Sequence, residues 1–156
     1  PHMHTIAAKA VAFHEALQPE FRDYAKQIVA NANTLAETLK NGCLKLISGG
    51  TSNHLILADV HSSFGIDGRE AQQRLESIGI TTNANAIPFD TLPPFRPSGL
   101  RLGTPATTTR DMGETEMRQI GEIIVRVLAS DGLSDSDIAN MRSQVRELAT
   151  NFRLPY

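Results

Sequence analysis

The stretch PEFRDYAKQIVANANTLAETLKNG, residues 19–42, decides how this chain folds. Pro19 suits the first turn of a helix, and Asn41 and Gly42 accept the left-handed conformation in which many helices end. Between them, apolar residues recur at spacings of three and four, which predicts a long amphipathic helix over residues 19–40. Its apolar face would consist of Phe21, Tyr24, Ile28, Ala32, Leu35 and Leu39.

The segments around this helix predict strands and further helices. An alanine-rich stretch over residues 5–17 favours a helix before it. After it, short apolar runs typical of strands alternate with runs that have helical periodicity. We expect strands at 44–48, 54–60, 80–83 and 100–103, a helix that begins at Asp67 and stops at Gly79, a helix over 114–128, and a last helix capped by Ser134.

This layout indicates the fold class. Asp67 and Glu70 have the spacing of a capping box, which supports the helix that follows them. We predict an α/β (or α+β) small domain, in which a few mostly antiparallel strands carry helices on one face. The two leading helices are too long for so small a sheet, so we expect them to pack on something outside this chain.

Composition excludes several classes of protein. The chain has 156 residues, 40% of them hydrophobic, and a net charge of −2 from 15 basic and 17 acidic residues. That balance gives no electrostatic case for a nucleic-acid partner, and no apolar run has the length of a membrane span. A single cysteine, Cys43, allows no internal disulfide, and no leader peptide is visible, so we expect a cytoplasmic protein.

The strongest candidate for a functional segment is the loop AIPFDTLPPFRPSG, residues 86–99, which contains four prolines and a glycine. Loops of this length are often functional, and proline reduces the entropy lost on ordering them. Arg101 follows, and the nearest carboxylates along the chain are Asp90 and Asp111. A guanidinium in this setting predicts a site for an external anion such as a carboxylate. The alternative is a salt bridge to an acid elsewhere in the fold.

The remaining reactive side chains predict no catalysis of their own. The five histidines and Cys43 have no metal-ligand spacing, so we expect no metal. No serine lies in a nucleophile elbow, and the four lysines fall on helices or at a strand edge, where their amines are solvated. From the residues alone, the chain is a small α/β module with an anion-binding Arg101 and a shaped loop.

Several stretches resemble one enzyme family, serine hydroxymethyltransferase. They are SGGTSNHLILADV (48–60), GITTNANAIPFD (79–90), PPFRPSGLRLGTPATTTRDMGE (93–114) and EMRQI (116–120). The opening, residues 1–21, resembles the segment just past that family's cofactor lysine. The order of the matches is preserved along nearly the whole chain, which resembles only the carboxy-terminal portion of the family.

The resemblance implies an activity. The family uses pyridoxal 5'-phosphate and interconverts serine and tetrahydrofolate with glycine and 5,10-methylenetetrahydrofolate, a step of one-carbon metabolism and glycine biosynthesis, as a homodimer of the aspartate-aminotransferase fold type. It implies that residues 1–18 pack on a large cofactor-binding domain and that residues 19–156 form the carboxy-terminal small domain, with 19–40 as a linking helix. The Schiff-base lysine lies upstream in the family, so the chain by itself would be inactive.

Residue by residue, the resemblance assigns one substrate contact and four folate contacts. Arg101 matches the arginine that binds the substrate α-carboxylate. The folate contacts match Asn85, Pro93, Pro94 and Phe95, although the family commonly has serine where Pro93 stands. Two further departures are Ser52, where an acid is usual, and His14, where a small residue is usual. The alternative function is a catalytically inactive, stand-alone module that binds folate or another protein.

Overall fold

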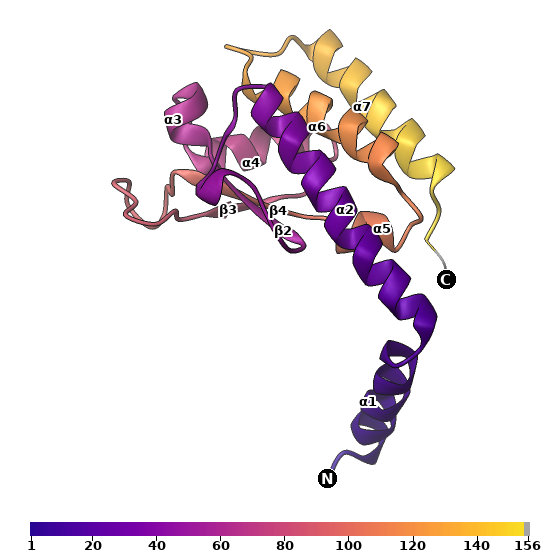
Figure 1. Cartoon of the computed structure of the whole chain (residues 1–156). Coiled ribbons are helices and arrows are strands. Elements are labelled where there is room, and N and C mark those ends of the chain that lie inside the picture. The colour runs from indigo at the N-terminus through magenta and orange to yellow at the C-terminus, as the bar shows by residue number, and fades with distance from the viewer. Residues whose placement is uncertain (155–156) are drawn as a thin grey trace.

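The computed structural model describes residues 1–154 and has a four-stranded sheet with helices against one face (Figure 1). Two helices lead the chain, α1 (Met3–Ala16) and α2 (Pro19–Asn41). The strands are β1 (Lys45–Leu46), β2 (Leu55–Asp59), β3 (Asn83–Asn85) and β4 (Gly99–Gly103). The other helices are the 3₁₀ turn η1 (Ile47–Gly49), α3 (Val60–Phe64), α4 (Gly68–Ser77), α5 (Pro105–Thr108), α6 (Glu114–Leu128) and α7 (Asp135–Asn151).

The sheet has the order β1-β2-β4-β3, and every neighbouring pair is antiparallel. Because side chains alternate along a strand, each strand presents one set to the helices and one set away from them. The set that faces the helices is apolar and buried: Ile56, Ala58, Leu100 and Leu102. It joins the inward residues of α2, α4 and α6 in one core cluster. The predicted α/β domain, with antiparallel strands and helices on one face, is confirmed.

The long helix α2 has the predicted amphipathic face, but only part of it is covered. Leu35 and Leu39 are buried in the core, whereas Phe21 near the start of the helix is 44% exposed. No residue of α1 is buried, and Figure 1 shows α1 leading away from the rest of the chain. No helix in the described part of the chain is both long and apolar enough to cross a membrane.

The end of α2 differs from the prediction at Gly42. Gly42 has φ −83°, and the residue that adopts the left-handed conformation is Cys43, with φ 65°. A Cβ atom on Gly42 would lie 2.3 Å from the Val125 side chain. Gly42 is therefore required for the close approach of α6 rather than for a left-handed turn.

Two predicted strands also differ from the structure. The strand expected at 44–48 is shortened to Lys45–Leu46, because the chain turns into η1, where Ser48 has φ 61°. The strand expected at 80–83 lies instead at Asn83–Asn85. Its start is delayed because Ile80 still closes the end of α4, through a hydrogen bond from its N–H to the Leu75 carbonyl.

The helix boundaries otherwise follow the sequence signals. Asp67 accepts a hydrogen bond from the Glu70 N–H and caps α4 as predicted, but the Glu70 carboxylate binds Arg74 instead of completing the capping box. Gly79 ends that segment with φ 90°. The helix predicted at 114–128 has those bounds, and Ser134 caps α7 in a full capping box with Asp137.

Candidate functional site

Arg101 lies at the centre of β4, on the face of the sheet that points away from the helices. The register places it opposite Leu57 of β2 and Asn83 of β3. The Arg101 side chain is exposed, and within residues 1–154 it forms no salt bridge. The alternative interpretation of Arg101, a salt bridge to an acid elsewhere in the fold, is therefore not found among these residues. A planar guanidinium without an internal partner can bind an external carboxylate through two hydrogen bonds.

A hollow of about 810 Å³ lies beside Arg101. Asn85 and Leu57 line it with Arg101, and so do the connection between η1 and β2, residues 48–53, and part of α2. That connection is held by its own side chains. The Thr51 hydroxyl donates to the Leu55 carbonyl at 2.6 Å, and the Asn53 side-chain oxygen accepts from the Leu55 N–H at 2.7 Å. The wall of the hollow thus has a defined shape before any ligand binds.

Asn85 is the second polar group in this hollow. It lies at the end of β3, opposite Gly99, and its side chain is half-buried. Its Nδ2 donates to the Ala86 carbonyl at 2.6 Å, which fixes the orientation of the amide. Across the described residues, the Asn85 Oδ1 has no hydrogen-bond partner, so it can accept one from a ligand.

The other predicted contacts are not in this hollow. Pro93, Pro94 and Phe95 lie on the loop between β3 and β4, and all three are exposed, Phe95 to 69%. This loop extends beyond the edge of the sheet (Figure 1). Phe95 lines a separate hollow of about 560 Å³ with Asp67 and Arg96. The structure therefore brings Arg101 and Asn85 together and leaves the three loop residues exposed outside their hollow.

Two buried carboxylates, Asp59 and Asp67, lie outside the hollow beside Arg101 and hold the starts of two helices. Burial raises the pKa of the Asp67 carboxyl, but hydrogen bonds from the Glu70 N–H and from Arg96 outweigh this effect and lower it. At Asp59, burial again raises the pKa, while hydrogen bonds from Ser62 and Lys45 lower it below the ordinary value. Both acids stay ionised and act as acceptors that fix the starts of α4 and α3.

The residues present do not offer a Schiff-base site for pyridoxal phosphate. None of the residues that line the hollow beside Arg101 is a lysine. Lys26, Lys40 and Lys45 each form a salt bridge with an acid, and Lys9 is exposed on α1. Within residues 1–154 no group of His, Cys, Asp and Glu could hold a metal ion. The hollow can bind an anion, but it contains no amine that could condense with an aldehyde.

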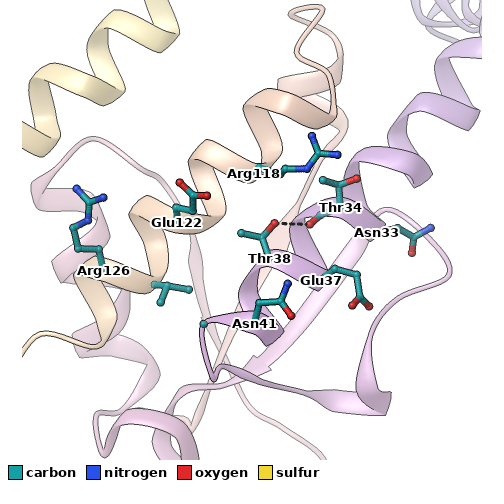
Figure 2. Close-up of a pocket in the computed structure, with 10 residues that line it drawn as sticks. Asn33, Thr34, Glu37, Thr38, Asn41, Arg118, Glu122 and Arg126 are labelled. Atoms are coloured by element: carbon teal, nitrogen blue, oxygen red, sulfur yellow. Dashed lines mark hydrogen bonds between the residues drawn. The ribbon is translucent and has the colours of Figure 1, made fainter.

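A second groove, of about 670 Å³, runs between α2 and α6 (Figure 2). Its charged residues include Glu37 and Arg118, which already have partners in Lys40 and Glu114. The Thr38 hydroxyl donates back to the Thr34 carbonyl at 2.8 Å. None of the predicted site residues lines this groove, so the hollow beside Arg101 is the better candidate.

The fold defines the chain as a small α/β domain, with an exposed arginine beside a hollow on its sheet. The sequence model of the family described as serine hydroxymethyltransferase matches residues 1–124. The chain belongs to this family.

Two curated relatives agree with the family match and show how much of a full-length relative this chain covers. A serine hydroxymethyltransferase of Koribacter versatilis is 52% identical over 155 residues, which cover 99% of this chain and 36% of the relative. One of Afipia carboxidovorans is 50% identical over 157 residues, which cover 97% of this chain and 36% of the relative. The chain therefore spans about a third of the length of these relatives.

Proposed function

We propose that this chain is the carboxy-terminal part of a pyridoxal-phosphate-dependent serine hydroxymethyltransferase, which interconverts serine and tetrahydrofolate with glycine and 5,10-methylenetetrahydrofolate. The observation that carries the proposal is the exposed guanidinium of Arg101, without a salt bridge in the described chain, in a hollow that it shares with Asn85. The names of the relatives, at about half identity, support the same reaction.

In this proposal Arg101 binds the α-carboxylate of serine or glycine. Its planar fork matches the two carboxylate oxygens, so the bound amino acid is held in one orientation rather than merely attracted. Asn85 offers an amide oxygen to a polar edge of the folate ring, and Pro93, Pro94 and Phe95 offer apolar surface to the ring itself. Pyridoxal phosphate would be held by other parts of the enzyme, and no step of the reaction is assigned to it.

The proposed partners are the rest of the enzyme chain and a second subunit. In α1, the large apolar residues Met3, Val11 and Phe13 are each more than half exposed, which is unusual for a helix that is surrounded only by water. We propose that residues 1–18 pack on the cofactor-binding domain, that residues 19–156 form the small domain, and that the assembled homodimer acts in the cytoplasm.

A chimera tests this function. This chain would replace the matching third of the Koribacter versatilis relative, and the product would be purified with pyridoxal phosphate. We expect tetrahydrofolate-dependent conversion of serine to glycine, and no conversion by the chain alone, because the chain lacks the lysine. A chimera that folds, binds pyridoxal phosphate and yet shows no turnover would contradict the proposal.

The second candidate is a catalytically inactive module that binds folate or another protein. It is favoured by one observation, that no lysine lines the hollow beside Arg101. Calorimetric titration of the isolated chain with tetrahydrofolate separates the two candidates. Binding by the isolated chain, together with an inactive chimera, would favour the module over the enzyme.

A further inference from the structure

The loop between β3 and β4, residues 86–98, is organised around one carboxylate, Asp90. Its Oδ2 accepts hydrogen bonds from the Ile87 N–H at 3.2 Å and from the Ser98 N–H at 2.9 Å. Its Oδ1 accepts from the Leu92 N–H at 3.0 Å and from the Ser98 hydroxyl at 2.5 Å. One side chain thus joins the beginning, the middle and the end of a loop that has no regular secondary structure.

Ser98 is itself fixed to the scaffold. Its carbonyl accepts from the N–H groups of Val60 and His61 at the start of α3, both at 3.1 Å. The preceding carbonyl, of Pro97, accepts from the Gly68 N–H at 2.7 Å, and Gly68 must be glycine because a Cβ there would lie 2.0 Å from the Gly99 carbonyl oxygen. Through Ser98, Asp90 therefore connects the loop to the backbone at the starts of α3 and α4.

The segment between these hydrogen bonds carries the proposed folate contacts Pro93, Pro94 and Phe95. Leu92 is held by Asp90, and the Arg96 N–H donates to the Pro93 carbonyl at 2.8 Å, which closes a turn over residues 93–96. The Arg96 side chain forms a salt bridge with Asp67 at 2.6 Å. Pro93, Pro94 and Phe95 are thereby presented to solvent in one conformation, although none of them is buried.

The Asp90 carboxylate has no cationic partner to explain its placement. None of the salt bridges found over residues 1–154 includes it, and all four of its hydrogen bonds come from the loop. Partial burial raises its pKa, but the hydrogen bonds from Ser98, Leu92 and Ile87 outweigh this and hold it well below the usual range. Among the residues that the structure describes, this carboxylate accepts hydrogen bonds from loop donors alone.

We propose that Asp90 is the positioning residue for the folate contacts of this loop, because its carboxylate fixes residues 87–98 in the conformation that presents Pro93, Pro94 and Phe95. This inference rests on the proposed function, which supplies the folate. It also predicts that folate binding depends on Asp90 and that serine binding does not, since Arg101 is held by the pairing of β4 with β2 and β3.

The test uses the full-length enzyme that carries this chain and compares Asp90→Asn with Thr91→Ala. Asparagine has the shape of aspartate, but its amide nitrogen cannot accept from the N–H groups that one carboxylate oxygen now binds. We expect the Kd for tetrahydrofolate to rise about tenfold or more, and the Kd for serine to stay within about twofold. Thr91 is exposed and makes no hydrogen bond among the described residues, so Thr91→Ala is expected to change neither.

A second variant keeps the test decisive if Asp90→Asn does not fold. Ser98→Ala removes one of the four hydrogen bonds and keeps the backbone donor, so we expect a smaller rise in the tetrahydrofolate Kd than for Asp90→Asn. Chymotryptic cleavage after Phe89 and Phe95, both exposed, reports loop order without any ligand and is expected to accelerate in both variants.

The outcomes distinguish this inference from the proposed function. Normal tetrahydrofolate binding by Asp90→Asn, or an equal loss of serine and folate binding at intact fold, overturns the positioning role. If Asp90→Asn does not fold, unchanged folate binding and unchanged cleavage in Ser98→Ala overturn it. Failure of the unaltered enzyme to bind tetrahydrofolate overturns the proposed function itself.

Discussion

At the scale of single residues, a substitution of Arg101 can test whether the planar shape of its guanidinium matters as well as its positive charge. In Arg101→Lys the positive charge remains, but the fork that matches a carboxylate is lost. We expect the serine KM to rise at least tenfold and tetrahydrofolate binding to stay unchanged, since the loss of one hydrogen bond to a charged group costs about 1.5–3 kcal/mol and about 1.4 kcal/mol corresponds to a factor of ten. Steady-state kinetics of the full-length enzyme measures this, with Arg118→Lys on the exposed face of α6 as the matched control. An unchanged serine KM would remove Arg101 from the carboxylate site.

Phe89, also at this scale, carries backbone strain. It has φ 59° and is fully exposed, so it adopts the left-handed conformation without any packing to compensate. Asparagine tolerates this conformation better, and Phe89→Asn should stabilise the folded state by about 1 kcal/mol. Urea denaturation would show the gain. Phe95→Asn is the control, because Phe95 is exposed but has no positive φ, and a gain as large in the control would rule out strain as the cause.

At the scale of elements, a buried polar contact joins α2 to the segment after β4. The Asn31 Nδ2 donates to the Thr108 hydroxyl at 2.9 Å and to the Met112 carbonyl at 2.8 Å, and Asn31 is fully buried. Asn31→Ala leaves two buried acceptors without this donor, so we expect a loss of about 2 kcal/mol in the free energy of unfolding. Asn33→Ala on the exposed side of the same helix should cost under about 0.5 kcal/mol. Equal losses would contradict the assignment.

The helices and loops also show which features of the fold can be predicted from the sequence and which cannot. The helix at 114–128 was predictable because its apolar residues keep the helical period along its whole length. Gly42 was misread, since a glycine needed for a neighbouring helix and a glycine needed for a left-handed turn look alike in a sequence. The sequence analysis named Asp90 only as one of the carboxylates nearest to Arg101 along the chain. Its role in the loop was missed because its hydrogen bonds to Ser98, eight residues away, depend on how the loop folds back. Arg101 has uncharged neighbours along the chain and no salt bridge among the described residues, and its ligand stays a prediction.

At the scale of the whole molecule, α1 should behave differently in the chain alone and in the full-length enzyme. Phe13 is 68% exposed and no residue of α1 is buried, so Phe13→Ser should change the unfolding free energy of the isolated chain by less than about 0.5 kcal/mol. If α1 packs on the rest of the enzyme, the same substitution there removes a buried aromatic ring and should cost about 3 kcal/mol. Thermal unfolding of both proteins measures the contrast, with Lys9→Ser on the same helix as the control. An equally small effect of Phe13→Ser in both proteins would mean that α1 faces water in the assembled enzyme, and the division at residue 18 would then lose its physical basis.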